Sequence, residues 1–501
     1  MDLLSTDFST VTKSLKEKKI SALEIAQFFL KRIEKLNPQL NAFTYVNDQL
    51  LDEAQKIDQK IFKNEELPKL CGAVFGIKDL ICTKDMPTTS GSKMLQNFIP
   101  PYNATVTQKL INAGAMISGK LNQDEFAMGS TSETSFYGPC FNPWDTTRVP
   151  GGSSGGSAAA QAARLSMGTL GTDTGGSIRQ PASFCGVVGI KPTYGRISRF
   201  GLVAYASSLD QAGPIVSSVK DAALTLEVIC GYDKNDSTTA QIEVENFHQK
   251  LNSDIKGKKV GYIKEHLQGL KNKDILKATL EALDFFKMNG AEVVEISIPL
   301  TEYAVPMYYI ISASEASSNL ARYDGIKYGY RSEKTKNEQL SLEEFYTLNR
   351  SEGFGDEVKR RIMLGTYCLS SGYFDAYYLK AGKVRRLLRD QFLAAFQKCD
   401  ILVGPVTTGV AFKIAEKTQD PLSSYLNDIY TTSTNLCGLP GMSVPYTFTK
   451  NINSDHTESV LPIGIQLTAN HFCEQTLLNF GHALEQSSAA LEFRKLRPNV
   501  Y

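Results

Sequence analysis

The clearest pattern near the start of the chain is that of an amphipathic helix. Ser21 is followed three residues later by Glu24, a pairing in which each side chain caps a free backbone N–H group at a helix start. Apolar residues recur at helical spacing at Leu23, Ala26, Leu30, Ile33 and Leu36. The pattern stops at Asn37 and Pro38. We therefore predict that a helix over residues 21–37 opens the fold.

The next segments combine short apolar runs with glycines and indicate strands alternating with helices. Residues 71–85 have the pattern of a strand pair that enters a sheet. Residues 104–113 are predicted to form a helix that ends at Gly114, and residues 115–118 a strand. An alanine-rich helix over residues 157–165 follows a glycine-serine loop directly.

The same alternation continues in the second half of the chain. Residues 259–263, 273–288 and 292–298 are predicted to form a strand, a helix and a strand. Further strand candidates are residues 401–403, 442–445 and 463–467. Because no low-complexity linker divides the chain, we predict one α/β domain over residues 1–501, with a helical segment over about 1–66 packed onto it.

Two polar stretches interrupt these elements. Residues 332–339 and residues 451–459 have the composition of exposed loops. We expect both to lie at the surface of the domain.

The composition is that of an ordinary globular protein. The chain has 501 residues, 42% hydrophobic and 21% charged, enough to bury a large core without metals or disulfides. Lys and Arg number 54 against 53 Asp and Glu, so the net charge is +1. This charge is too small for a strong attraction to nucleic acid or anionic lipid. Any contact with RNA is therefore expected to be local or to be made by a partner.

Cysteine usage and hydropathy favour a cytoplasmic protein with no membrane partner. The nine cysteines are scattered and never spaced as Cys-x-x-Cys, which suits core residues in a reducing compartment. Residues 1–12 lack the pattern of a signal peptide, and no apolar run reaches the ~20 residues that a membrane helix needs. No group of His, Cys and carboxylate residues has the spacing of a zinc site, so we expect no metal in this chain.

Two glycine-serine loops carry the chemistry. Residues 151–157 read Gly-Gly-Ser-Ser-Gly-Gly-Ser, and residues 171–177 read Gly-Thr-Asp-Thr-Gly-Gly-Ser. Glycine permits positive φ and close approach, so successive amides can converge on one oxygen atom. We expect an oxyanion hole from the N–H groups around Thr174, Gly175, Gly176 and Ser177. One such loop would more often be a flexible turn or a phosphate cradle, but two loops with candidate nucleophilic serines favour catalysis.

A serine nucleophile needs a base, and in most serine hydrolases that base is histidine. The five histidines all follow residue 247, and none lies in a segment like a nucleophile elbow. Lys78, in the apolar segment Gly76-Ile77-Lys78-Asp79, is the alternative. It must be neutral to accept a proton, which burial favours by lowering the pKa of its ammonium group. The competing interpretation is a surface lysine paired with Asp79.

One further motif is discarded. Residues 114–120 match a phosphate-binding P-loop up to Lys120, but Leu121 stands where Ser or Thr would hold magnesium. The segment also follows a predicted helix rather than a strand. We interpret Gly114 as a helix cap and expect no ATP site here.

The Lys78 segment and the two loops, the second continuing as Ile178-Arg179, resemble the amidase signature family. The resemblance implies that Lys78 is the base, Ser153 the serine that relays the proton, and Ser177 the nucleophile that forms an acyl-enzyme. It also implies a single α/β/α layered domain around a large mixed central sheet. This fold agrees with the alternation of strands and helices.

Further segments resemble the branch of the family that hydrolyses glutamine within tRNA-dependent amidotransferases. This likeness extends from the first helix to about residue 490 and includes residues 124–129, 314–320, 350–355 and 439–441. It implies glutamine as substrate and two further subunits, B and C, as partners. The ammonia would pass to glutamate on a mischarged tRNA, which the chain meets mainly through a partner. ATP and magnesium are then expected on the partner, and no cofactor in this chain.

Binding of glutamine needs an acid for the α-ammonium and a cation for the α-carboxylate. By resemblance these are Asp428 and Arg361. The competing interpretation is that both are solvated charges on helix faces, because Lys359 and Arg360 directly precede Arg361.

The resemblance also implies that Tyr308 lines the glutamine pocket, with Gly129 and Ser130 beside it. The neighbouring Tyr309 is an alternative to Tyr308. A stand-alone amidase for another small amide and a non-enzymatic anion-binding module are the competing functions. Whether glutamate, aspartate or both are amidated on tRNA is left open, because that choice belongs to the partner.

Overall fold

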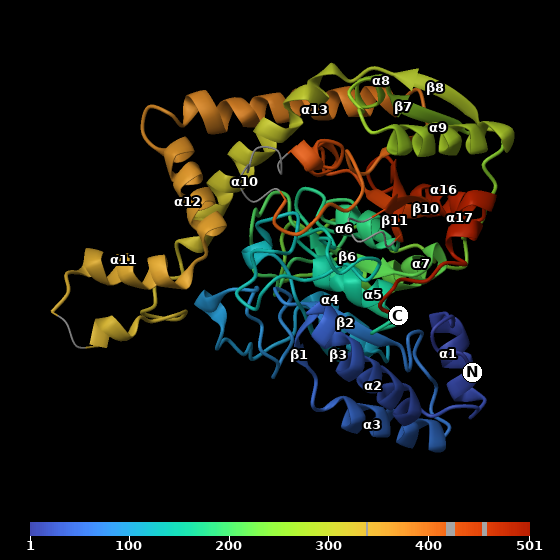
Figure 1. The fold of residues 1–501 in the computed structure, drawn as a ribbon, viewed down its shortest axis with the longest axis horizontal. Coiled ribbons are helices and arrows are strands. Elements are labelled where there is room, and N and C mark those ends of the chain that lie inside the picture. The colour runs from blue at the N-terminus through green and yellow to red at the C-terminus, as the bar shows by residue number, and fades with distance from the viewer. Residues whose placement is uncertain (337–338, 417–425, 453–457) are drawn as a thin grey trace.

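The computed structural model of the chain describes residues 1–336, 339–416, 426–452 and 458–501 (Figure 1). The described strands form one 11-stranded sheet in the order β1-β3-β2-β4-β6-β5-β10-β11-β9-β7-β8. They are β1 Phe43–Val46, β2 Val74–Lys78, β3 Met116–Leu121, β4 Gly168–Asp173, β5 Val188–Lys191, β6 Gln211–Val216, β7 Lys259–Ile263, β8 Glu292–Ile296, β9 Ile401–Pro405, β10 Gly441–Ile452 and β11 Glu458–Thr468. Strand β2 is parallel to β3 and β4, whereas β10 is antiparallel to β5 and β11. The sheet is therefore mixed, as predicted.

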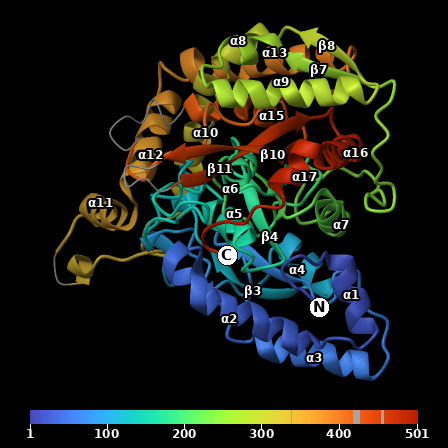
Figure 2. The same cartoon turned by 45° about the vertical axis from the view of Figure 1, so that its right-hand side comes forward.

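Strands β2 to β6 are buried at every residue, so both faces of the central sheet are covered. The described α-helices are α1 Phe8–Lys16, α2 Ala22–Leu40, α3 Leu50–Phe62, α4 Thr105–Asn112, α5 Gly155–Ala162, α6 Arg179–Cys185, α7 Val219–Ile229, α8 Lys264–Gln268, α9 Lys273–Met288, α10 Ala304–Leu320, α11 Leu342–Gly353, α12 Asp356–Leu369, α13 Lys380–Ala395, α15 Thr432–Leu436, α16 Glu474–Glu485 and α17 Ser488–Phe493. Helix α11 projects away from the sheet (Figure 1). Figure 2 shows α2 and α3 at one end of the molecule and α9 at the other. The layering confirms the predicted α/β/α fold.

Short 3-10 and π-helical turns complete the described elements. They are η1 Lys93–Leu95, η2 Glu125–Ala127, η3 Pro299–Tyr303, η4 Glu333–Lys336, η5 Asp375–Leu379 and η6 Leu426–Asp428. The turn η5 is a π-helix, and it connects the end of α12 to α13.

The N-terminal prediction is partly confirmed. The capping box is present, with Glu24 N donating to Ser21 Oγ at 3.1 Å and Ser21 N to Glu24 Oε2 at 2.8 Å. Two expectations were wrong: α1 precedes this helix, and α2 continues through Pro38 to Leu40. Proline in the last turn removes one N–H, but Leu40 is fully buried, and its packing holds the turn in helical form.

The segment after α3 also differs from the prediction. Residues 71–85 contain the single strand β2 rather than a strand pair, and Ile81 forms only an isolated bridge with Leu202. The P-loop look-alike lies in strand β3, where Lys120 is buried and donates from Nζ to Thr88 Oγ1 at 2.8 Å. The segment is therefore part of the buried sheet and not an exposed loop.

The later elements agree with the pattern. Strand β7 and helix α9 have the predicted bounds, and β9, β10 and β11 extend the predicted C-terminal strands. The predicted loop at 451–459 is shorter than expected, because strands β10 and β11 include its two ends. Residues 337–338 and 453–457 lie outside the described residues. In the other predicted loop, Ser332 is buried rather than exposed, and η4 follows it.

The cysteines are mostly core residues, as the composition indicated. All nine cysteines are free thiols, and eight of them are buried. In the part of the chain that the structure describes, no helix combines the length and the apolar character needed to cross a membrane.

Helices α10 and α12 pack closely against each other on one side of the sheet. Their contact depends on Gly365 in α12. A Cβ atom at this position would lie 1.9 Å from Ala313 O in α10. Backbone contact at this distance leaves no room for any side chain, so glycine sets the spacing of the two helices.

We predict that Gly365→Ala lowers the free energy of unfolding by about 1–3 kcal/mol, because the new methyl group must push the two helices apart. The matched control is Gly382→Ala in α13, where a Cβ atom would meet nothing within 4 Å. Alanine there should raise stability by up to about 1 kcal/mol, since glycine is a poor helix former. Thermal unfolding followed by circular dichroism measures both changes. Equal midpoints for the two variants would contradict the packing argument.

Candidate active site

Lys78 lies at the end of β2, and its side chain is fully buried. Its Nζ donates to Ser153 Oγ at 2.7 Å, to Ser154 Oγ at 2.9 Å and to Thr172 Oγ1 at 3.0 Å. An ammonium group has three N–H donors, so three hydroxyl groups satisfy it completely. The structure therefore rules out the surface lysine and places Lys78 against the predicted relay serine.

The surroundings of Lys78 bring the pKa of its amine close to neutral pH. Burial lowers the pKa of the ammonium group to about 7, although the carboxylates of Asp124, Asp173 and Asp210 raise it. Each of these carboxylates is already bound by other donors. Asp124, for example, accepts from Ser132 N at 2.9 Å. Near neutral pH a substantial fraction of Lys78 can therefore accept a proton.

The first glycine-serine loop is held by the segment around Asp124. Asp124 N donates to Ser153 O at 3.3 Å. A Cβ atom on Gly152 would lie 2.2 Å from Asp124 Oδ2, and one on Gly156 would lie 2.4 Å from Asn122 O. The peptide bond between Gly152 and Ser153 is cis. The glycines of this motif thus allow the loop to pack against a buried carboxylate and buried backbone.

The second loop carries Ser177, whose side chain is almost fully buried. Ser154 N donates to Ser177 O at 3.1 Å, so the two loops meet through their backbones. Within the described residues, no hydrogen bond joins the hydroxyls of Ser153 and Ser177 directly. Transfer of a proton between these two serines therefore remains a prediction.

Asp173 holds the loop that bears Ser177 in place. Its carboxylate accepts from Gly176 N at 2.8 Å and Ile178 N at 3.2 Å. It also accepts from Asn435 Nδ2 at 2.8 Å and forms an ion pair with Arg179, whose Nε lies at 3.0 Å. Burial alone would raise the pKa of this carboxyl group, but Arg179 holds it at about 2. Asp173 is therefore charged at any physiological pH.

This arrangement corrects one part of the predicted oxyanion hole. The N–H group of Gly176 is used by Asp173 and is not available to a substrate oxygen. The amides of Thr174, Gly175 and Ser177 make no hydrogen bond with any other described residue. These three remain the candidates, because a developing negative charge needs donors that are free to reach it.

Arg179 connects the loop to the C-terminal part of the chain. Its guanidinium donates from Nη1 to Gln466 Oε1 at 2.7 Å and from Nη2 to Asn435 Oδ1 at 2.6 Å. The carbonyl oxygen of Thr431 accepts from both terminal nitrogens at 3.2 Å. The arginine is fully buried, so this network is shielded from water.

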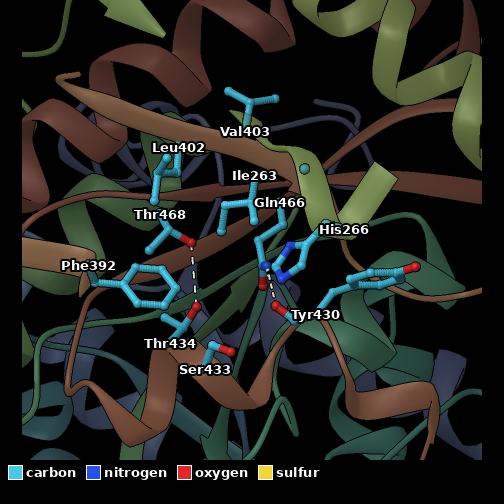
Figure 3. Close-up of a pocket in the computed structure, with 11 residues that line it drawn as sticks. Ile263, His266, Phe392, Leu402, Val403, Tyr430, Ser433, Thr434, Gln466 and Thr468 are labelled. Atoms are coloured by element: carbon cyan, nitrogen blue, oxygen red, sulfur yellow. Dashed lines mark hydrogen bonds between the residues drawn. The ribbon is translucent and has the colours of Figure 1, made fainter. Parts of the chain in front are cut away.

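Behind Gln466 lies a small cavity of about 20 Å³, shown in Figure 3. Gln466 Nε2 donates to Tyr430 O at 2.8 Å, and His266 packs its ring against that of Tyr430. Burial lowers the pKa of His266 to about 4, so the ring is neutral. The volume suits about one water molecule and is too small for an amino acid.

Arg361 lies in α12 with only 4% of its surface exposed. Its Nη1 donates to Tyr205 OH at 2.7 Å, and its Nε donates to Glu357 Oε1 at 2.8 Å. The neighbouring Lys359 pairs with the exposed Asp356, and the exposed Arg360 shares Glu357 with Arg361. The interpretation of Arg361 as a solvated charge is therefore wrong.

Asp428 is also buried, and Tyr309 OH donates to its Oδ2 at 3.4 Å. Burial raises the pKa of Asp428 to about 7, against the effect of Arg361. The guanidinium carbon of Arg361 lies 5.2 Å from the centre of the Tyr309 ring. Tyr309 thus stands between the two charged groups that were predicted to hold the ends of an amino acid.

Tyr308 faces the other part of the site. A Cβ atom on Gly175 would lie 2.5 Å from the Tyr308 ring, so this tyrosine packs on the predicted oxyanion loop. Gly129 lies against Asp124, and Ser130 O accepts from Gln180 Nε2 at 3.0 Å. Both tyrosines therefore border the site, Tyr309 at Asp428 and Tyr308 at the loop.

Several residues of the site were missed in the sequence. Ser154 and Thr172 both bind Lys78, and both lie inside the two motifs, where their hydroxyl groups were a visible signal. Asn435, Gln466 and Tyr205 come from distant segments, and no local pattern marks them. No group of metal-ligating side chains occurs among the described residues.

Comparison with known proteins agrees with this geometry. The sequence model of the family described as Amidase matches residues 24–478. The chain belongs to the amidase family. Its fold, the two loops and the buried lysine are thus features of an amidase-type enzyme.

Relatives of this amidase are similar over their whole lengths. The A subunit of glutamyl-tRNA(Gln) amidotransferase from Bdellovibrio bacteriovorus is 60% identical over 97% of this chain and 98% of its own length. The protein of the same name from Carboxydothermus hydrogenoformans is 50% identical over the full length of both chains.

Solved structures show the same similarity. The crystal structure of the corresponding protein from Thermotoga maritima, which has the same name, has a TM-score of 0.78 and 38% identity, covering 97% of this chain and 96% of its own. A peptide amidase in complex with chymostatin has a TM-score of 0.80 and 28% identity, covering 99% of both chains.

We predict that the kcat of this amidase rises as the pH increases through about 7. Lys78 is protonated below its pKa and neutral above it, and only the neutral amine can take the serine proton. Lys78→Arg should be nearly as inactive as Lys78→Ala at every pH, because guanidinium stays charged up to ~12. Initial rates of amide hydrolysis across neutral pH measure this. Substantial activity of the arginine variant would refute the role of base.

Asp173→Asn should lower the free energy of unfolding by about 3–5 kcal/mol, because Arg179 is then buried without its counter-ion. The kcat should fall as well, since the nucleophile loop loses its anchor. The matched control is Asp145→Asn, which removes the buried partner of Arg148 at 3.1 Å. It should lower stability and leave kcat almost unchanged. Unfolding midpoints and kcat are measured for both variants. A wild-type kcat for Asp173→Asn would show that Asp173 does not anchor the loop that bears Ser177.

Proposed function

We propose that the chain hydrolyses glutamine and supplies the ammonia to a tRNA-dependent amidotransferase of which it is one component. The observation that carries the proposal is the pair Arg361 and Asp428. Both are buried, and Tyr309 stands between them. Thr431 Oγ1 donates to Asp428 O at 3.2 Å and to Gly175 O at 2.6 Å, which connects the pair to the loop that bears Ser177. Opposite charges held in this way suit the carboxylate and the ammonium of a free amino acid.

The chemistry follows from the geometry of Lys78. The neutral amine takes the Ser177 proton through Ser153, and Ser177 Oγ attacks the side-chain amide carbon of glutamine. Amide N–H groups of the second loop bind the resulting oxyanion. The amide nitrogen regains the proton and leaves as ammonia, which gives a γ-glutamyl ester on Ser177. Water then attacks the ester, with Lys78 as base, and releases glutamate.

Burial of the site supports this sequence of steps. Ser177 has only 7% of its surface exposed, and Lys78, Ser153 and Asp173 have none. In such a site hydrogen bonds to developing charge are stronger than they are in water. Each proton transfer also stays within the chain, between groups that are shielded from solvent.

The amidotransferase role is supported by the relatives, which carry the name of the A subunit of glutamyl-tRNA(Gln) amidotransferase over nearly the whole chain. These relatives and the buried charge pair favour it over a stand-alone amidase. We expect two partner subunits, B and C, in the cytoplasm. One of them would bind ATP, magnesium and tRNA. For tRNA the reason is that the net charge of +1 gives this chain little attraction for RNA.

The purified chain alone should release glutamate from glutamine slowly and form no Gln-tRNA(Gln) when ATP and Glu-tRNA(Gln) are added. The reason is that the acceptor is activated on a partner subunit. Ser177→Ala should lower the rate of glutamine hydrolysis by several orders of magnitude, because members of a catalytic unit fail together. Product formed on tRNA without any added partner would overturn the proposal.

Substrate identity is tested in the same preparation. Asp428→Asn removes the charge that faces the α-ammonium and should raise the KM for glutamine at least about tenfold, the loss of a charge-assisted hydrogen bond. Its effect on a small amide without an α-ammonium, such as butyramide, should be slight. An equal effect on both substrates would exclude the assigned role of Asp428.

A further inference from the structure

Helix α12 carries apolar residues on the face that points to solvent. Its buried residues are Val358, Arg361, Gly365 and Cys368, which follow helical spacing along one face. On the opposite face Met363 is 72% exposed and Tyr367 is 45% exposed. A helix at the surface of a globular protein normally has the reverse arrangement, with polar side chains outside.

The exposed residues continue into the turn after α12. The ring of Tyr367 lies 4.5 Å from that of Tyr373 and 5.7 Å from that of Tyr377, and the last two are 6.0 Å apart. Each of these rings is at least 36% exposed, and so is Phe374 beside them. We call Met363, Tyr367, Tyr373, Phe374 and Tyr377 the tyrosine patch.

The tyrosine patch lies at the periphery of the molecule. Figure 1 shows the connection from α12 to α13 at the outer edge, away from the central sheet, and Figure 2 agrees. Tyr373, Phe374 and Tyr377 lie in or next to the π-helix η5, a rare conformation that is frequent at functional sites. The patch is therefore accessible along its whole length in the isolated chain.

Its composition is that of a protein-protein interface. Contiguous exposed apolar patches are rare on monomers, and tyrosine and methionine are enriched at interface cores, where they supply most of the binding energy. The flanking charge is mostly positive. Lys380 and Lys383 are exposed and make no ion pair with any other described residue, and Asp375 is the carboxylate between the tyrosines. A partner that fits has an apolar centre flanked by carboxylates.

We propose that the tyrosine patch is the docking surface for a partner subunit of the amidotransferase, with an apolar, acid-flanked face. This inference rests on the proposed function. It adds the place at which the partner binds and the element through which it acts on the site.

The position of the patch gives the partner a direct route to the substrate. Tyr367 and Arg361 lie on the two faces of α12, so a partner bound outside is one helix diameter from the predicted carboxylate site. Gly365 fixes α12 against α10, which carries Tyr308 and Tyr309. Because α12 packs directly on α10, docking is expected to change the KM for glutamine. This coupling needs only a small displacement of α12.

The test is Tyr373→Arg, which places a charge at the centre of the patch without touching the active site. The chain is combined with the two other subunits expressed from the same cells, and its affinity for them is measured by surface plasmon resonance. We expect association at least about 30-fold weaker than in the wild type, the loss typical of a hot-spot residue. The control is Phe62→Arg at the end of α3, which is 82% exposed and far along the chain from α12. This variant should associate normally.

Glutamine hydrolysis by the isolated Tyr373→Arg chain shows that the variant is folded, and its rate should equal that of the isolated wild type. Adding the two subunits should change the KM for glutamine of the wild type. The same addition should leave the KM of Tyr373→Arg unchanged. Normal association of Tyr373→Arg would overturn the inference. If the isolated chain instead forms a dimer that Tyr373→Arg disrupts, the occupant is a second copy. If the wild type binds neither of the other subunits, the proposed function itself fails.

Discussion

The active site depends on the buried ion pair between Asp173 and Arg179. Both side chains are fully buried, so each charge is stable only while the other remains in place. The carboxylate holds the backbone of the nucleophile loop, and the guanidinium binds Thr431, Asn435 and Gln466. One interaction thus links the loop that bears Ser177 to a segment some 250 residues later in the chain. Loss of either charge would release the loop and leave the other charge unpaired.

Lys78 is buried without an ion-pair partner in the described part of the chain, in contrast to Asp173 and Arg179. Its three donors go to hydroxyl groups, and no carboxylate lies within ion-pair distance among the described residues. The nearby carboxylates of Asp124 and Asp173 are held by backbone amides or by Arg179. Desolvation therefore outweighs the attraction of these charges, and the pKa of Lys78 falls to about 7. The amine of Lys78 can therefore exist without its proton although it lies in the same core as charged carboxylates.

Helices α10 and α12 connect this chemistry to the surface. Their inner faces supply Tyr308, Tyr309 and Arg361, and the outer face of α12 with the turn after it supplies the tyrosine patch. In the proposed function, one helix would thus support the predicted substrate contact at Arg361 and the proposed partner contact at the surface.

The sequence determined those features that depend on neighbours in the chain. Glycine spacing at 151–157 and 171–177 marked both loops, Lys78 could be selected because the chain offered no suitable histidine, and helical periodicity gave α9 its bounds. The tertiary structure decided the rest: that Gly176 donates to Asp173, that Arg361 is buried, and that Tyr308 and Tyr309 face different groups. It also extended α2 through Pro38. These outcomes depend on packing between residues far apart in the chain, and the free energy of that packing leaves no trace in local spacing.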